Sequence, residues 1–186
     1  MAQAAIPPRD NCFFYFAYGS NLLRERIQLR NEAPDFCSTA CLQDFKLAFG
    51  SPQGQTSSCW QGCSATIVPS PGDEVWGVVW QMNKNCLSTL DKQEGVECGL
   101  YVPIEIIVRT QKGQELACRS YEMKDTVCGL PSPQYKRVIC MGAKQNCLPT
   151  EYQKQLEAIE TNEYTGTLPV MEEIEAALRQ IGKRTN

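Results

Sequence analysis

The segment Tyr18-Gly19-Ser20-Asn21 has residue types that could hold an anion. It follows an aromatic run, Cys12 to Tyr18, whose composition predicts a buried strand, and residues 22–27 have apolar spacing typical of a helix. Ser20 or Asn21 suits the N-cap of that helix. A strand that ends at a glycine before a helix leaves backbone N–H groups free for a carboxylate or an oxyanion. The alternative is a strand–turn–helix whose cap is only structural, since every helix has free N–H groups.

Glu94 is the second candidate for chemistry. It follows Leu87 by seven residues and Leu90 by four in a predicted helix, Lys84 to Glu94, which Asn83 caps and Gly95 ends. This spacing places the carboxyl on the apolar stripe, where burial and the negative end of the helix dipole both raise its pKa. Such a group suits a general base near neutral pH. The alternative is a helix-end glutamate that points into solvent.

The chain has no histidine. This excludes Ser-His-Asp and Cys-His catalysis, HExxH metalloproteases and every zinc site that contains histidine. A general acid or base must therefore be Asp, Glu, Lys, Tyr or Cys.

The eleven cysteines raise the alternatives of a metal site and of plain packing residues. Cys37, Cys41, Cys59 and Cys63 form a C-x3-C-x17-C-x3-C pattern that resembles a four-thiolate zinc site. In an extended strand, however, the first two sulfurs would lie roughly 13 Å apart. We therefore expect no metal and regard these residues as small buried hydrophobes. Their odd number, and the lack of a readable signal peptide, predict free thiols in a reducing cytosol.

Ser132-Pro133-Gln134-Tyr135 has the pattern of a helix start, with a cap followed by a proline in the first turn. The hydroxyl of Tyr135 could reach a cleft while its ring packs. A purely structural role is the alternative.

The predicted elements place these residues in one α+β domain. Strands are expected at 12–18, 41–49, 65–68, 74–82, 101–110 and 114–123, with a turn at 69–73, a loop at 51–62 and an edge or bulge at Pro103. Helices are expected at 22–27, 84–94, 132–144, 149–159 and 171–181. This order predicts a mixed β-barrel or sheet with flanking helices. We expect a mobile tail at 1–11, a catalytic domain at 12–168 and a C-terminal helix and tail at 169–186.

The composition of the chain argues against two classes of partner, nucleic acids and membranes. The formal net charge is −3, so there is no basic excess to neutralise nucleic-acid phosphates. No apolar run approaches the ~18 residues of a membrane span. We expect neither nucleic acid nor a membrane as a partner.

Taken together, the motifs resemble the γ-glutamylcyclotransferase family from about Phe13 to Gly166. The segments that carry the resemblance are Tyr15 to Leu23, Leu42 to Leu47, Ser70 to Trp80, Gln93 to Val96, Ser132 to Lys136 and Cys140 to Lys144. The resemblance implies a mixed β-barrel with flanking helices and a homodimer. It also implies an enzyme that cyclises γ-glutamyl-amino acids to 5-oxoproline without a metal or cofactor and releases the free amino acid.

The resemblance also implies roles for individual residues. Glu94 would be the general acid and base, and Tyr101 and Tyr135 would line the pocket. The γ-glutamyl group would be bound by Tyr15, Phe16, Ala17, Tyr18, Gly19, Ser20 and Asn21. Two alternatives stay open: a cyclotransferase for γ-glutamyl-amines such as ε-(γ-glutamyl)-lysine, and a non-catalytic ligand-binding protein of the same fold.

Overall fold

A computed structural model of the chain describes residues 5–52, 54 and 57–184. Of the tail expected at 1–11, residues 1–4 lie outside the described part, as do residues 53 and 55–56 of the loop expected at 51–62. The end of the tail lies against the barrel: Arg9 N donates to Gln81 Oε1 at 2.9 Å and Lys84 N donates to Asn11 O at 2.8 Å.

Five strands close into a mixed barrel, and a sixth short strand extends it. Their order is β3-β1-β5-β4-β2-β6, and the additional β2–β3 pairing closes the ring. Only β1 and β5 pair in parallel among the described strands. The strands are β1 (Cys12–Ala17), β2 (Asp35–Pro52), β3 (Ser64–Asn83), β4 (Tyr101–Thr110), β5 (Glu115–Met123) and β6 (Thr126–Cys128). The predicted α+β barrel is confirmed, and β6 is an element that the sequence pattern missed.

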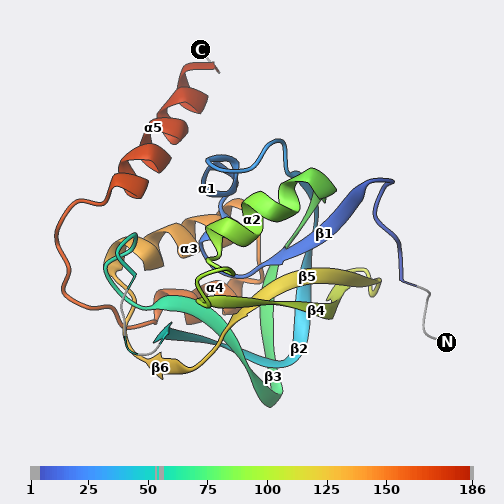
Figure 1. Ribbon diagram of the computed structural model, residues 1–186, viewed down its shortest axis with the longest axis horizontal. Coiled ribbons are helices and arrows are strands. Elements are labelled where there is room, and N and C mark those ends of the chain that lie inside the picture. Colours follow the sequence, from blue (N-terminus) through green and yellow to red (C-terminus); the bar gives the residue numbers. More distant parts are fainter. Residues whose placement is uncertain (1–4, 53, 55–56, 185–186) are drawn as a thin grey trace.

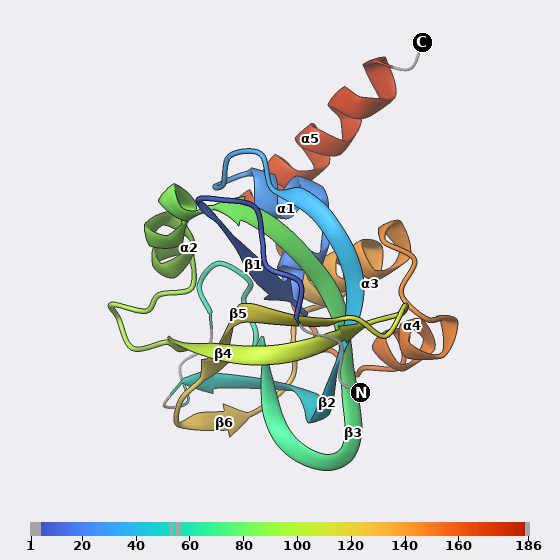
Figure 2. The ribbon, with the colours of Figure 1, turned by 90° about the vertical axis from the view of Figure 1, so that its right-hand side faces the viewer.

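The longest pair, β2 with β3, differs from the prediction of separate strands at 65–68 and 74–82. One strand runs from Ser64 to Asn83, and its register against β2 shifts between Gln43 and Phe45. The turn residues therefore form a bulge opposite Asp44, whose side chain accepts from Gly72 N at 3.0 Å. Gly72 has φ +86, which glycine adopts readily. The turn chemistry bends β3 without ending it, and β3 curves round in Figure 2.

The helices lie outside the barrel (Figures 1 and 2). They are α1 (Arg24–Gln28), α2 (Leu87–Gln93), α3 (Pro133–Gln145), α4 (Thr150–Glu157) and α5 (Pro169–Arg184), with 3₁₀ turns at Ser20–Leu22 and Lys84–Cys86. In Figure 2, α2 lies on one side of the barrel and α3 and α4 on the other, while α5 projects away from it. The predicted cap of α3 is present, because Ser132 Oγ accepts from Tyr135 N at 3.2 Å.

The first predicted helix is wrong in detail. Residues 20–28 form a 3₁₀ turn and a separate short α-helix, and neither Ser20 nor Asn21 acts as a side-chain cap. The interruption falls at Leu23, whose backbone is extended (φ −83, ψ 123). Leu22 and Leu23 are both buried, so packing of the turn outweighs helix continuity.

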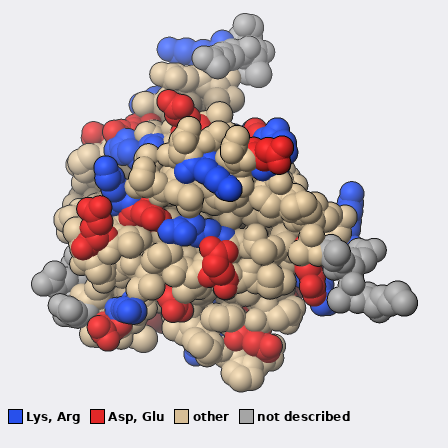
Figure 3. Space-filling view, turned by 45° about the vertical axis from the view of Figure 1, so that its right-hand side comes forward, with Lys and Arg blue, Asp and Glu red and all other residues tan. Residues whose placement is uncertain are grey.

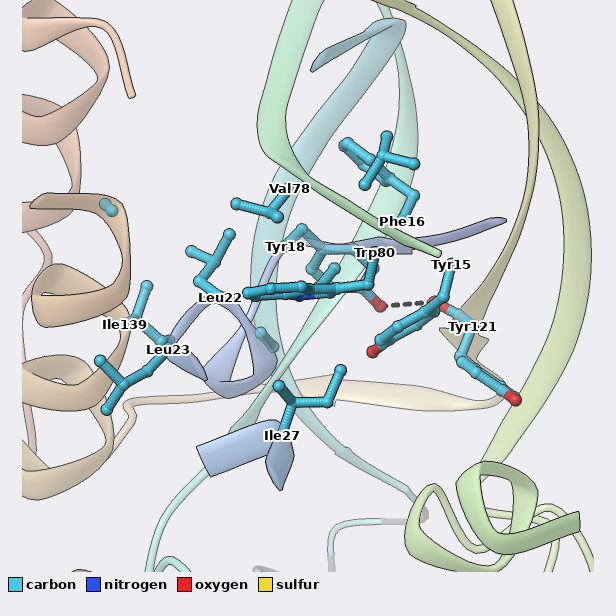
Figure 4. Packing of buried hydrophobic residues seen from close by; sticks show 14 of the residues in the cluster. Tyr15, Phe16, Tyr18, Leu22, Leu23, Ile27, Val78, Trp80, Tyr121 and Ile139 are labelled. Atoms are coloured by element: carbon cyan, nitrogen blue, oxygen red, sulfur yellow. Dashed lines mark hydrogen bonds between the residues drawn. The ribbon is translucent and has the colours of Figure 1, made fainter. Parts of the chain in front are cut away.

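The core joins the barrel to the turn after β1. Figure 4 shows the ring of Trp80 with Leu22, Leu23 and Ile139 on one side and Tyr15 and Tyr121 on the other. Trp80 is completely buried, and its Nε1 donates to Asn21 O at 2.9 Å. This bond holds the turn against β3.

The surface agrees with the charge count. On the face in Figure 3, acidic and basic side chains are interspersed, and the blue groups form no broad patch. Separately, no helix among the described residues has the length and apolar character needed to cross a membrane.

Candidate active site

A pocket opens where the end of β1, the end of α2 and strands β3 to β5 meet, and its empty space, including the mouth, is about 340 Å³. It is enclosed mainly by polar groups. Its lining residues are Tyr15, Tyr18, Gly19, Ser20, Asn21, Ala65, Glu94, Tyr101, Tyr121 and Tyr135. The fold therefore brings together the two segments in which the sequence predicted chemistry, although more than seventy positions separate Gly19 from Glu94.

Gly19 places main chain, without a side chain, at the pocket wall. A Cβ built on Gly19 would lie 3.2 Å from Tyr135 Oη and 3.3 Å from Ala65 Cβ, which is tighter than ordinary contact. Its φ is −113, so Gly19 does not serve a left-handed backbone conformation. The lack of a side chain therefore matters here for space. The 3₁₀ turn that follows has no side-chain cap, which leaves its N-terminal end to the pocket.

Glu94 reaches the pocket because α2 ends directly before it. Glu94 N donates to Leu90 O at 3.0 Å, and Gly95 follows with φ +67, so the predicted glycine stop is confirmed. Leu90 is completely buried and fixes the inner face of the helix. Glu94 is half-buried, follows this helix directly and lines the pocket.

The environment of Glu94 makes its carboxyl a weaker acid than an ordinary glutamate. Burial raises the pKa of Glu94 to about 7, the positive charge of Arg26 opposes this rise, and the negative charge of Asp91 adds to it. Asp91 is itself held by Arg119, whose Nη2 lies 2.9 and 3.0 Å from its two oxygens, and by the hydroxyl of Tyr121. Glu94 can therefore exchange a proton near neutral pH.

Asn21 links the two segments through its side chain. Its Nδ2 lies 3.2 Å from Tyr15 Oη and 3.5 Å from Glu94 Oε1, and its Oδ1 accepts from Gln93 Nε2 at 3.1 Å. Gln93 in turn accepts from Asn31 at 3.0 Å. The expected cap residue thus orients the carboxylate instead.

The remaining walls are neutral hydroxyl groups. Burial raises the pKa of each pocket tyrosine above its ordinary value, so these phenols stay protonated. Tyr101 Oη donates to Ala65 O at 2.6 Å, and Tyr135 Oη accepts from Ala65 N at 2.9 Å. Tyr18 donates to Tyr121 O, the bond drawn in Figure 4. These bonds fix Tyr18, Tyr101 and Tyr135 on the main chain, while Tyr15 and Tyr121 are held by the side chains of Asn21 and Asp91.

Not every residue that the sequence indicated lies in the pocket. Phe16 and Ala17 are fully buried in the barrel core and do not line it. Ala65 and Tyr121 line it without having been indicated, because strand pairing, not sequence spacing, brings them there. Pro103 pairs with Tyr121 in regular register, in a part of β4 that has no second neighbour among the described strands, so it lies at an edge and not at a bulge.

Arg26 is a further residue that sequence reasoning missed. It is 7% exposed, and its charge acts on Glu94. The signal was present: Arg26 follows Leu22 by four residues and Leu23 by three, so it shares the spacing of the apolar residues. That spacing is the signal that singled out Glu94.

No cysteine lines this pocket, and the expectation of four small buried hydrophobes is half wrong: Cys41 and Cys63 are buried, whereas Cys37 and Cys59 are exposed. All eleven fall within the described ranges, and each is a free thiol. Burial raises the pKa of Cys41 to about 12, and hydrogen bonding to Glu74 adds to the rise. Within the described ranges, no three Cys, Asp or Glu side chains gather as a metal-ligand set. The pocket can thus offer proton transfer by one carboxylate, hydroxyl contacts and exposed backbone.

Comparison with known proteins gives the class first. The AIG2-like family model matches residues 74–156, a range that includes Glu94, Tyr101, Tyr121 and Tyr135 of the pocket. A solved structure named γ-glutamyl cyclotransferase superposes with a TM-score of 0.87 at 59% identity, covering 91% of this chain and 99% of that one.

Curated relatives identify the family to which the chain belongs. The γ-glutamylcyclotransferase of Bos taurus is 62% identical over 94% of this chain and 92% of that protein. The human γ-glutamylcyclotransferase is 60% identical over 93% of this chain and 91% of that protein. The chain belongs to the γ-glutamylcyclotransferase family, and the prediction that it is an enzyme of this family is confirmed.

Proposed function

We propose that the enzyme converts γ-glutamyl-amino acids into 5-oxoproline and a free amino acid. The α-amino nitrogen of the substrate attacks its own γ-carbonyl carbon, a C–N bond forms to close a five-membered ring, and the γ-amide C–N bond breaks. Water is not a reactant. The enzyme must hold a folded, near-attack conformer and move one proton, and a pocket with fixed walls suits the first task.

Glu94 is the group proposed to move the proton. An α-amino group has a pKa of about 8, so it is largely an ammonium at neutral pH and cannot attack. A carboxylate with an ordinary pKa would take its proton uphill by about 5 kcal/mol. With the pKa of Glu94 raised to about 7 by burial, the gap falls to roughly 1–2 kcal/mol. The same carboxyl then returns the proton to the leaving nitrogen.

The wall opposite is proposed to stabilise the developing charge. Negative charge grows on the γ-carbonyl oxygen as the ring closes, and the backbone at Gly19 and Ser20 lines the pocket without an intervening side chain. A backbone donor at such an oxyanion is worth about 3–4 kcal/mol. Tyr101 and Tyr135 are proposed to shape the site, since their hydroxyls are fixed on Ala65.

One observation carries this proposal: the carboxylate of Glu94 lies in the same pocket as the Gly19–Ser20 backbone. The test is 5-oxoproline release from γ-glutamyl-alanine, glutathione and ε-(γ-glutamyl)-lysine, assayed side by side. We expect release from γ-glutamyl-alanine. Absence of 5-oxoproline from all three would overturn the proposal, and release from the lysine amide alone would identify a γ-glutamylamine enzyme instead.

We also propose that the enzyme is a cytosolic homodimer with its catalytic unit at 12–168. The resemblance supports the dimer, and the free thiols support a reducing compartment. The C-terminal helix is proposed to be an appendage anchored by its first half, because Val170, Met171 and Ile174 are buried while the rest projects away in Figure 1. Sedimentation velocity tests the dimer, and a single boundary at monomer mass would contradict it.

A further inference from the structure

Arg26 is a buried cation without an adequate partner. Its residue is 7% exposed, and its Nε is buried with no hydrogen-bond partner in the part of the chain that the structure describes. It forms no ion pair with a described residue, whereas Arg30, on the same side of the molecule, pairs with Glu173 at 3.0 Å. Burying a guanidinium that lacks an ion pair is unfavourable, and an anionic ligand in contact with it would offset this cost.

An aromatic ring holds this side chain in place. The guanidinium carbon of Arg26 lies 5.6 Å from the ring centroid of Trp60, and Trp60 is itself 5% exposed. A ring beneath a guanidinium stabilises it by cation–π attraction and uses none of its N–H donors. The donors at the edge stay available, in the planar fork that matches a carboxylate.

The position of Arg26 determines which part of a bound substrate it would contact. The inner pocket does not include it. A wider groove continues from that pocket, shares Ser20, Glu94, Tyr101 and Tyr135 with it, and adds Arg26 and Trp60. A substrate with its glutamyl part in the inner pocket and its γ-amide beside Glu94 must extend its leaving group into this groove.

We infer that Arg26 binds the α-carboxylate of the leaving amino acid and so selects γ-glutamyl-amino acids over γ-glutamyl-amines. This inference rests on the proposed function. The leaving carboxylate is separated from the reacting γ-amide nitrogen by one carbon atom, so it enters the groove with the scissile bond still beside Glu94. It would then meet the planar guanidinium fork of Arg26, which lines the groove.

The experiment compares two substrates that differ in one charge, γ-glutamyl-alanine and γ-glutamyl-alaninamide. For the unaltered enzyme we expect kcat/KM to favour the free carboxylate by about 10- to 100-fold, the ratio that one charge-assisted hydrogen-bonding group supplies. Arg26→Met should remove most of that preference, because it slows the acid more than the amide; loss of its charge also raises the pKa of Glu94, and that effect is common to both substrates. Arg26→Lys should keep part of it, since a charge without the planar fork remains.

Arg30→Met is the matched control, because it removes a nearby cation that is already paired with Glu173. It should leave the preference unchanged. Equal kcat/KM for both substrates in the unaltered enzyme would overturn the inference without any variant. A parallel fall for both substrates in Arg26→Met would also overturn it, because Arg26 would then act only through folding or through Glu94. Turnover of neither substrate by the unaltered enzyme would instead refute the proposed function.

Discussion

Asn21 Nδ2 lies 3.5 Å from Glu94 Oε1, between the turn that follows β1 and the end of α2. The amide is held on its other side, because Oδ1 accepts from Gln93 at 3.1 Å and the main-chain oxygen accepts from Trp80 at 2.9 Å. Together with the contact of Nδ2 to Tyr15 Oη at 3.2 Å, these bonds set the orientation of Asn21. Glu94 therefore meets a fixed donor at one of its carboxylate oxygens, in the pocket that both residues line.

Replacing Glu94 with glutamine should abolish turnover and leave binding largely intact. The amide has the same shape but cannot accept the ammonium proton, and loss of a general base typically costs about 10²–10⁴-fold in rate. The measurement is 5-oxoproline release under saturating substrate, with ligand binding followed by thermal shift. Residual kcat within about tenfold of the unaltered enzyme would remove Glu94 from the role of base.

The same replacement should stabilise the fold at alkaline pH. Burial raises the pKa of Glu94 from 4.5 to about 7, so between these values the native state holds more protons than the unfolded state. The free energy of unfolding therefore falls as pH rises through this window, and above it the loss is complete. Glu94→Gln has no such loss.

At pH 8 we expect the free energy of unfolding of Glu94→Gln to exceed that of the unaltered enzyme by about 1–2 kcal/mol. This figure allows for the partial solvent contact of the residue. The two proteins should converge near pH 4.5. Urea unfolding at several pH values measures this difference. Glu97→Gln, at an exposed position, is the matched control and should show no such trend. A constant offset between Glu94→Gln and the unaltered enzyme across pH would contradict the raised pKa.

Asp91→Asn should shift the pH dependence of catalysis toward lower pH. The negative charge of Asp91 contributes to the raised pKa of Glu94, and its removal also leaves the charge of Arg119 unbalanced, which acts in the same direction. The ratio of kcat/KM at pH 6 to that at pH 8 should therefore increase. An unchanged profile, with only a lower maximum, would mean that Asp91 positions Tyr121 and Arg119 without influencing Glu94.

The sequence was sufficient for the parts of the site that local spacing determines. Glu94 shares a helix face with Leu90, and Gly95 ends that helix, so both could be read from positions within one segment. Arg26 had the same signal beside Leu22 and Leu23. An arginine on an apolar stripe is easily taken for a long surface side chain, which is why the cation was missed.

Other parts depend on contacts distant in sequence. Tyr121 enters the wall because β5 pairs with β1 and β4, and Ala65 enters it through the long β2–β3 pairing; neither position has a local signal. The sequence predicted two strands where β3 is one continuous strand, because the residue types that form a bulge are the same as those that form a turn between strands. Phe16 and Ala17 belong to the segment whose other residues line the pocket, yet both are fully buried in the core of the closed barrel.

Gly19→Ala tests the backbone wall. The added Cβ would lie 3.2 Å from Tyr135 Oη and 3.3 Å from Ala65 Cβ, so both neighbours must shift by a few tenths of an ångström. The φ of −113 is not left-handed, and we expect the melting temperature to change by only a few degrees. Misplacement of reacting groups on this scale lowers catalysis much more, by about 10- to 100-fold in kcat/KM.

A second substitution shows whether crowding at Tyr135 is the cause. Tyr135→Phe removes the hydroxyl that the new methyl group would meet, so Gly19→Ala should cost less activity in the Tyr135→Phe background than in the unaltered enzyme. A fall in kcat with constant KM would mean that the backbone at Gly19 stabilises the transition state. A rise in KM would mean that it binds the substrate before the reaction. Unfolding midpoints on the same samples separate either effect from misfolding. Full kcat/KM in Gly19→Ala would place the reacting atoms away from this backbone.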